Sequence, residues 1–178
     1  MESTGHSAPG HWIGNSPPRS RADHPVVNIS WLDAAAFCSW AGVQIPNEAQ
    51  WEKAARGCDF RQFPWGDTRP ECYLCNFAGC HEDTTSVLAS IHGSSPYGCV
   101  DMAGNVWEWT NSYWSATPYS HHVVRNKRQG DTRRVVKGGS FRSTAALLHC
   151  AARLDQYPNY SFDDVGLRVV SSSITGRS

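Results

Sequence analysis

The pattern of hydrophobic and polar positions changes along this chain. Between residues 30 and 57 apolar residues recur at the spacing of a helix, and around residue 107 they alternate as in a strand. From residue 58 to residue 100 no period is sustained, and turn residues are frequent. Two short helices, short strands and long irregular loops predict an α+β fold rather than a parallel α/β sheet.

Both predicted helices carry start and stop signals. Ser30 can cap the first helix, Asp33 can return the hydrogen bond, and Gly42 can end the helix. In the second helix Asn47 and Gln50 form the same kind of capping box. The residues predicted to pack inward are Ala34, Phe37, Cys38 and Ala41 in the first helix, and Trp51, Ala54 and Ala55 in the second.

The alternating stretch, residues 101–109 (DMAGNVWEW), is a Gly-Asn turn that runs into a strand. A period of two places Trp107 and Trp109 on one face, where two indoles can form a core platform. Glu108 points to the other face, beside the Asn105 side chain and the carbonyl groups of the turn. Taken alone, the stretch is either a buried hairpin with a solvated glutamate or a group of oxygens that suits Ca²⁺.

Length and composition exclude several classes of protein. A chain of 178 residues with zero formal net charge is expected to form one domain and not to bind nucleic acid. No apolar run approaches the length of a membrane span, so no membrane insertion is expected. Residues 1–10 have no apolar signal-peptide core, which predicts synthesis in the cytoplasm.

The predicted organisation has three parts. Residues 1–23 are a polar N-terminal tail on the surface, anchored by Trp12; residues 24–171 are the domain; residues 172–178 are a polar C-terminal tail. Within the domain, residues 115–133 are predicted to form a polar loop. His121 and His122 in that loop are interpreted as a solvated pair rather than metal ligands.

The cysteines leave several states open. Seven cysteines cannot all pair, which favours a reducing compartment with at most one local bridge or a metal clip. Cys72, Cys75 and Cys80 lie close together in the irregular region, and Cys58 or His81 could complete a zinc site with them. The spacing is irregular, so a local Cys72–Cys80 disulfide or free thiols are preferred to zinc.

Four further stretches support a resemblance to a known family. With residues 101–109 they are residues 24–31 (HPVVNISW), 45–52 (IPNEAQWE), 134–141 (RVVKGGSF) and 166–168 (GLR). Together, and in this order, they resemble the formylglycine-generating-enzyme-like family, also called the sulfatase-modifying factor family. The resemblance covers roughly residues 24 to 170. It implies the C-type-lectin fold, with two short helices, short antiparallel strands and long irregular loops.

The resemblance also implies two calcium sites. Asn76, the Phe77 carbonyl and Asp83 match one set of family ligands, and Asn105, Val106 and Glu108 match the other. Calcium at either set would be structural, because it would hold loops that no sheet ladder holds.

The family's enzymes oxidise a sulfatase cysteine to formylglycine with a pair of cysteines that hold copper after the Gly-Gly-Ser motif. Here the residues after Gly138-Gly139-Ser140 contain no sulfur before Cys150, which resembles a structural family position. The position of its family disulfide partner is occupied by Ala55, and Cys38 faces Val169 in the same way. We therefore expect no copper and no oxidase activity. The family's iron-dependent sulfoxide synthases need an additional helical domain, for which the sequence shows no sign.

The segment from Phe141 to Asp164 matches the exposed ligand face of the C-type-lectin fold. Between frame residues it mixes aromatic and small polar residues, as in an antibody paratope. The residues predicted to contact a ligand are Arg142, Ser143, Thr144, Leu147, Leu154, Gln156, Tyr157, Asn159, Tyr160, Phe162, Asp163 and Asp164.

This composition resembles the variable protein of a diversity-generating retroelement, in which adenine-containing codons near the C-terminus are rewritten. The predicted function is therefore non-catalytic binding of a protein or glycan ligand. Two alternatives remain open: a formylglycine-generating oxidase, and an orphan structural domain of the same family, in which these are ordinary loop residues.

The strands that usually precede residue 24 in this family are absent from the sequence. Either the segment around Trp12 takes their place, or a sheet edge is covered by another subunit. Self-association and display on a virion or cell surface through a partner are hypotheses at this stage.

Overall fold

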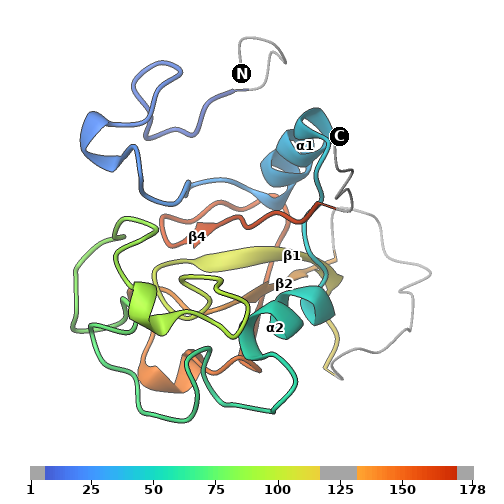
Figure 1. Ribbon diagram of the computed structural model, residues 1–178. Helices are drawn as coiled ribbons and strands as arrows, with labels where there is room; N and C mark the ends of the chain where they lie inside the picture. Colours follow the sequence, from blue (N-terminus) through green and yellow to red (C-terminus); the bar gives the residue numbers. More distant parts are fainter. Residues whose placement is uncertain (1–6, 117–131, 172–178) are drawn as a thin grey trace, which may run out of the picture.

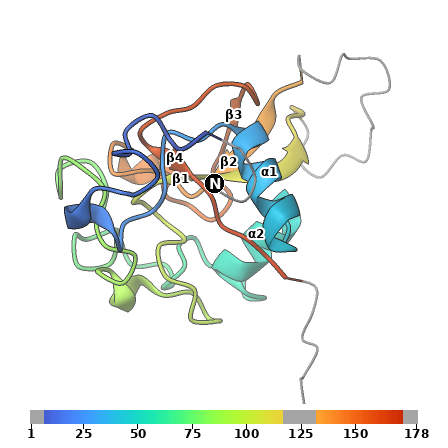
Figure 2. The same ribbon diagram turned by 90° about the horizontal axis from the view of Figure 1, so that it is seen from above.

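The computed structural model describes residues 7–116 and 132–171. The 3₁₀ helices are η1 (Arg19–Arg21), η2 (Ile91–Gly93) and η3 (Ala145–Leu147), and the α-helices are α1 (Trp31–Ala41) and α2 (Glu48–Arg56). The strands are β1 (Trp107–Tyr113), β2 (Arg134–Lys137), β3 (Arg153–Gln156) and β4 (Val165–Gly166). Both helices lie on one side of the molecule, and most of the irregular segment drawn in green lies on the other (Figures 1 and 2). The predicted α+β class is confirmed.

The two helices begin as predicted. The Ser30 hydroxyl accepts from the Asp33 amide, and the Asp33 carboxylate accepts from the Ser30 amide, which closes the capping box of α1. Asn47 and Gln50 form the same reciprocal pair at α2. Gly42 ends α1 in the left-handed conformation, with φ of 69°.

The predicted buried stripe of α1 is only half correct. Ala34 and Cys38 pack against the sheet, whereas Phe37 is 48% exposed and Ala41 is also exposed. Each residue turns 100° around the helix, so Phe37 points along its flank rather than at the sheet, and it packs beside Trp40. Ala41 is the last residue of the helix and lies beyond the buried turn. In α2 the prediction holds, with Trp51 and Ala55 buried and Ala54 half-buried.

The sheet has four strands in the order β3-β2-β1-β4. β2 pairs antiparallel with both β1 and β3. These pairs confirm the predicted antiparallel strands, and β4 adds a pairing that was not predicted: it runs parallel to β1, with Trp107 opposite Val165 and Glu108 opposite Gly166. Gly166 lies so close to the segment before α1 that an added Cβ would be 2.6 Å from the Val26 carbonyl oxygen.

The tryptophans of β1 form the predicted core platform. Trp107 and Trp109 pack in one cluster with Ile29, Val136 and Val165. The Trp109 indole N–H donates to the Ile29 carbonyl at 3.0 Å, so its burial leaves no unpaired donor.

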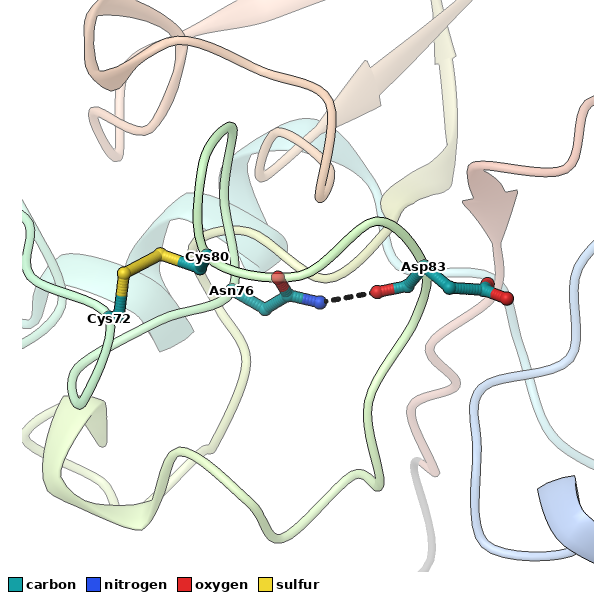
Figure 3. The surroundings of a disulfide bond; sticks show 4 residues. All are labelled: Cys72, Asn76, Cys80 and Asp83. Atoms are coloured by element: carbon teal, nitrogen blue, oxygen red, sulfur yellow. Dashed lines mark hydrogen bonds between the residues drawn. A yellow bond between two sulfur atoms is a disulfide. The ribbon is translucent and has the colours of Figure 1, made fainter.

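A disulfide joins Cys72 and Cys80 in the irregular region (Figure 3). This pairing is one of the preferred sequence-based alternatives, and it removes two of the thiolates that a zinc site would need. Cys75, between them, is buried as a free thiol.

The N-terminal residues pack on the domain more closely than a polar tail would. η1 lies within them, and the Arg21 guanidinium forms an ion pair with Asp83. Trp12, the predicted anchor, is half-buried and lines a cavity together with Phe37 and Trp40 of α1. The segment runs above the sheet toward α1 (Figure 1). Residues 1–6 and 172–178, and most of the predicted loop 115–133 with His121 and His122, lie outside the described residues.

Candidate ligand-binding site

The polypeptide from β3 to β4 is held by main-chain hydrogen bonds at each end. β3 pairs with β2 along all four of its residues. Beyond β3, the Pro158 carbonyl accepts from the Leu32 amide at the start of α1, and the Phe162 carbonyl accepts from the Asn28 amide. The Asp164 carbonyl then accepts from the Trp107 amide in β1. These bonds give the loop 157–164 a defined shape.

Three aromatic side chains follow one another on this loop. Tyr157 and Tyr160 are 43% and 52% exposed, and their ring centroids are 5.5 Å apart. Phe162 is half-buried, and its ring lies 6.4 Å from that of Tyr160. The Arg133 guanidinium lies 5.6 Å from the Tyr157 ring, and it also pairs with Asp155. The two tyrosines therefore form an exposed apolar surface with a cation at its edge.

An ion pair lies on the same segment. Arg142 donates two hydrogen bonds to the Asp163 carboxylate, at 2.7 and 2.9 Å, and both side chains are more than half exposed. The hydrogen bonds from Arg142 lower the pKa of Asp163. Because the pair is exposed, it can exchange its partners with a ligand at little cost.

The predicted contact residues differ in their exposure. The exposed ones are Arg142, Thr144, Leu154, Tyr157, Asn159, Tyr160 and Asp163; the half-buried ones are Leu147, Gln156, Phe162 and Asp164. We call these eleven residues the C-terminal face. Leu147 and Phe162 also pack against the main core cluster, and Asp164 accepts from the Ser140 hydroxyl at 2.9 Å. Arg133 and Asp155 adjoin the face but were not predicted; Asp155 lies between Leu154 and Gln156 in the sequence, whereas Arg133 comes from the segment before β2 and reaches the face only in the folded chain.

Ser143 does not belong to this face in the structure. Its side chain is buried, and its hydroxyl accepts from the Ser140 amide at 2.9 Å, within the turn after the Gly-Gly-Ser motif. Its carbonyl accepts from the Ala78 amide. A small polar residue can fit either a turn or a surface, so composition alone did not separate the two roles.

The segment after Gly-Gly-Ser offers no thiol where the family's oxidase chemistry would need one. η3 occupies residues 145–147, and the next sulfur, that of Cys150, is fully buried beside Trp51, Ala55 and Met102. Burial raises the pKa of Cys150 to about 11, so the thiol stays protonated near neutral pH. In the described parts of the chain no group of three or more His, Cys, Asp or Glu residues could hold a metal ion.

The first predicted calcium set fits only in part. The Asn76 side-chain oxygen is buried without a partner, as a cation ligand could be, and its amide nitrogen donates to the Asp83 carbonyl at 2.8 Å. The Asp83 carboxylate, however, points away from Asn76 and pairs with Arg21 (Figure 3). The Phe77 carbonyl accepts from the Cys80 amide. Calcium here stays a prediction, and a melting temperature measured with calcium and with a chelator would test it.

In the second predicted calcium set the side-chain oxygens are bonded within the protein, and calcium there stays a prediction. Glu108 is buried, and its carboxylate accepts from the Trp51 indole at 2.6 Å and from the Arg168 guanidinium at 2.8 and 2.9 Å. The Asn105 side chain is bonded to the Thr85 main chain and to Asp101. Val106 contributes a buried side chain next to this turn. The oxygens of Glu108 and Asn105 are thus occupied by protein donors.

Fold and site together define a C-type-lectin domain with an exposed C-terminal face. The sequence model of one protein family, the sulfatase-modifying factor enzyme 1-like domain, matches residues 2–173, so this chain belongs to that family. The formylglycine-generating enzyme of Thermomonospora curvata is 37% identical, over 86% of this chain and 57% of that protein. The inactive C-alpha-formylglycine-generating enzyme 2 of Bos taurus is 32% identical, over 87% of this chain and 52% of that protein.

Among solved structures, Treponema denticola variable protein 1 has the same fold. Its TM-score is 0.66 at 20% sequence identity, and the match covers 92% of this chain and 77% of that one. The chain spans about half the length of the curated relatives it matches first. Of the helices in the described residues, none has the length and apolar character needed to cross a bilayer.

Proposed function

We propose that this protein is a non-catalytic member of its family that binds a protein or glycan ligand through the C-terminal face. The observation that carries the proposal is the pair Tyr157 and Tyr160, about half exposed on a loop that main-chain bonds hold in place. Rigid aromatic side chains contribute large contact area at low entropic cost. The Arg142–Asp163 pair adds charged groups that can rearrange around a ligand.

The case against an oxidase rests on the cysteines of the described residues. Cys38, Cys75 and Cys150 are buried, Cys72 and Cys80 are paired, and neither Cys58 nor Cys99 follows the Gly-Gly-Ser motif. No copper is expected, because copper chemistry needs thiolates together. The similarity to formylglycine-generating enzymes keeps oxidation of a sulfatase cysteine as the second candidate. Copper-dependent oxygen uptake with a cysteine-containing peptide would establish that candidate, and we expect none.

We further propose that the protein is the variable protein of a diversity-generating retroelement. The mixture of Tyr, Asn, Asp and Ser between residues that match the family's frame supports this proposal. The test is to sequence the DNA around the gene. We expect a near-copy of the codons for residues 141–168, differing only at adenines, beside a reverse-transcriptase gene. If the near-copy is absent, the protein is not of this kind, and the binding proposal stands on the next experiment alone.

The binding experiment uses peptides, because the natural ligand is unknown. A displayed random-peptide library is selected on the folded protein, and an enriched peptide is titrated against variants by calorimetry. Tyr157→Ala and Tyr160→Ala should each weaken binding by roughly tenfold, the usual effect of removing an aromatic anchor. Tyr73→Ala is the matched control, because Tyr73 is 61% exposed and lies outside the C-terminal face.

Two outcomes would contradict the proposal. One is equal loss of affinity in all three tyrosine variants, which would mean that peptides bind to exposed aromatic rings without preference. The other is that no selected peptide depends on any residue of the C-terminal face, which would favour a purely structural domain. Self-association is tested separately, by sedimentation of the purified protein at high concentration. A monomer would remove self-association.

A further inference from the structure

A second group of reactive side chains lies at the C-terminal end of α2, and it shares no residue with the C-terminal face. Gly57 ends the helix with a φ of 71°, which an L side chain rarely adopts. A Cβ added at Gly57 would be 3.0 Å from Pro96 Cγ, so the end of α2 packs directly on the turn 95–98. The residue after Gly57 is Cys58, an exposed free cysteine.

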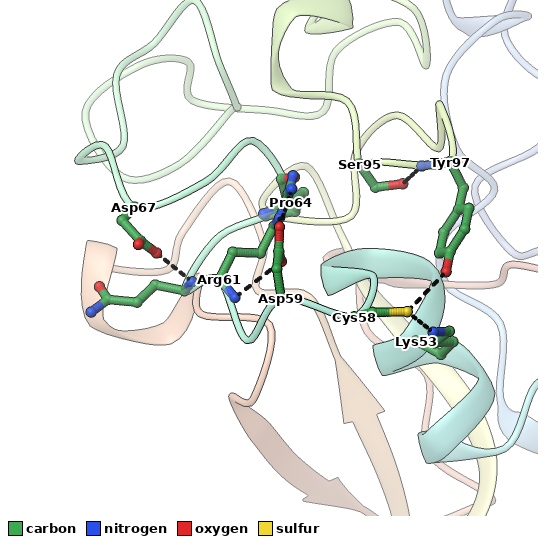
Figure 4. Close-up of polar contacts among 9 residues, drawn as sticks. Lys53, Cys58, Asp59, Arg61, Pro64, Asp67, Ser95 and Tyr97 are labelled. Atoms are coloured by element: carbon green, nitrogen blue, oxygen red, sulfur yellow. Dashed lines mark hydrogen bonds and ion pairs between the residues drawn. The ribbon is translucent and has the colours of Figure 1, made fainter.

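Hydrogen bonds of Ser95 hold the turn 95–98 in place. The Ser95 carbonyl accepts from the Gly98 amide at 2.9 Å, and the Ser95 amide donates to the Cys99 carbonyl at 2.9 Å. The Ser95 hydroxyl accepts from the amides of Tyr97 and Cys99, at 3.3 and 3.2 Å. The turn therefore presents the Tyr97 ring to the end of α2 (Figure 4).

Lys53 and Tyr97 converge on the sulfur of Cys58. Lys53 Nζ lies 2.5 Å from Cys58 Sγ, and the Tyr97 hydroxyl lies 3.9 Å from it. Lys53 Nζ is also 5.8 Å from the centre of the Tyr97 ring. The three side chains come from α2, from the second residue after it and from the turn 95–98, so the arrangement depends on the tertiary fold (Figure 4).

The charges around the sulfur favour the thiolate. The hydrogen bond from Lys53, followed by that from Tyr97, lowers the pKa of Cys58, and the same contact with Cys58 raises the pKa of Lys53. Asp59 acts in the opposite direction, but its carboxylate is paired with Arg61, which lowers the pKa of Asp59 to about 2. The C-terminal end of the helix dipole also opposes a negative charge, more weakly than a direct contact with an ammonium group.

The other free thiols of the described residues differ from Cys58. Burial raises the pKa of Cys75 to about 12 and that of Cys150 to about 11, and it also raises the pKa of Cys38. Cys99 is half-buried. Cys58 alone among the free thiols of residues 7–116 and 132–171 is exposed and in contact with a cationic side chain.

We propose that Cys58 is a site of covalent modification, at which Lys53 and Tyr97 hold an exposed thiolate that reacts with hydroperoxides. In this step the sulfur attacks the distal oxygen of the peroxide and the O–O bond breaks. The sulfur gives up two electrons and becomes a sulfenic acid, while the peroxide is reduced. The departing alkoxide or hydroxide takes a proton from the Lys53 ammonium group. Exposed thiolates of lowered pKa are the ones that undergo this oxidation.

The first test measures nucleophilicity with iodoacetamide. The folded protein receives short pulses of the reagent across a pH series, and digestion with mass spectrometry then gives a rate for each cysteine. At pH 7 we expect Cys58 to be labelled faster than Cys99 and far faster than Cys150. Lys53→Met should slow labelling of Cys58 by roughly threefold or more and move its pH profile to higher pH, because the thiolate loses its cation. Tyr97→Phe should have a smaller effect in the same direction.

Arg69→Met is the matched control, because Arg69 is an exposed cation outside the cluster. It should leave the labelling rate of Cys58 unchanged. Slow labelling of Cys150 in every variant reports that the fold is intact, so a misfolded variant is recognised within the same experiment. An unchanged rate in Lys53→Met, or equal slowing in Arg69→Met, would overturn the role of Lys53.

The second test uses hydrogen peroxide with dimedone, which traps sulfenic acids. We expect dimedone on the Cys58 peptide of the wild-type chain, less of it in Lys53→Met, and none at this position in Cys58→Ser. Dimedone spread equally over Cys58 and Cys99 would overturn the proposal, because the cluster would then confer no selectivity.

Discussion

At the scale of single residues, buried carboxylates in this protein are partnered by cations from distant parts of the chain. Glu108 is bonded to Trp51 and Arg168, and Glu48 pairs with Arg153 at 2.7 Å. Glu52 pairs with Lys137, whose side chain is fully buried, at 3.1 Å. A buried charge without its partner is strongly unfavourable, so these pairs make the fold depend on single side chains.

Glu108→Ala should lower the free energy of unfolding by about 3 kcal/mol, because it leaves the Arg168 guanidinium and the Trp51 indole without their acceptor. Glu108→Gln keeps an acceptor and should lose less. Urea denaturation followed by tryptophan fluorescence measures both. Asp163→Ala is the control, because the exposed Arg142–Asp163 pair should contribute no more than about 1 kcal/mol. Equal losses in Glu108→Ala and Asp163→Ala would contradict this interpretation.

Sequence reasoning at this scale succeeded where the chemistry is local. The capping pairs of Ser30 with Asp33 and of Asn47 with Gln50 span three residues each, so the spacing alone identifies them. The partner of Glu108 is sixty residues away, and no local pattern points to it. The family resemblance predicted a calcium-binding role for Glu108, and it did not predict the ion pair with Arg168 that the structure shows.

At the scale of elements, α2 contributes four side chains that contact residues outside the helix. It presents Glu48 and Glu52 to cations of the sheet, Trp51 to Glu108, and Lys53 to Cys58. Its N-terminus is defined by the Asn47 cap and its C-terminus by Gly57. Loosening either end would therefore affect both the core and the cysteine cluster.

Asn47→Ala removes the side-chain acceptor for the Gln50 amide, and it should destabilise the protein by about 1 kcal/mol. Asn47→Asp preserves the acceptor and should cost little. Thermal unfolding of both variants checks the expectation. If the two variants have the same melting temperature as the wild-type chain, the cap contributes nothing to stability.

The elements themselves were easier to predict than their pairing. The alternation of residues 105–109 located β1, and the spacing of apolar residues located both helices. The parallel pairing of β4 with β1 was not predicted, because a strand of two residues carries no pattern that specifies its partner. The exposed flank of α1 was missed for a related reason, since apolar spacing does not show how wide a face the sheet will cover.

At the scale of the whole molecule, the loop that carries most of the C-terminal face is held mainly by main-chain hydrogen bonds. It follows β3, which pairs with β2, and it is bonded to the start of α1 and to Asn28. Composition predicted which residues contact a ligand, and in the structure all of them except Ser143 have side chains that are exposed or half-buried. Their relative positions could not be predicted, because they depend on the order of strands in the sheet.

A chain carrying Tyr157→Ser, Asn159→Ser and Tyr160→Asn together should have a free energy of unfolding within about 1 kcal/mol of the wild-type value, as expected for surface substitutions. The reason is that these side chains are exposed. Pro158→Ala is not expected to be as neutral, because Pro158 is buried. Chemical denaturation of both chains would decide, and a large loss in the triple variant would show that the face is part of the core.

The main-chain bonds from the loop 157–164 to Asn28, Leu32 and Trp107 have a consequence for which codon changes the loop can tolerate. Peptide groups are the same whichever amino acid a codon specifies, provided it is not proline at a donor position. When main-chain hydrogen bonds set the backbone conformation of a loop, codon changes can replace its side chains while that conformation is preserved. Each rewritten gene would then encode different side chains on the same backbone, and so a different binding surface.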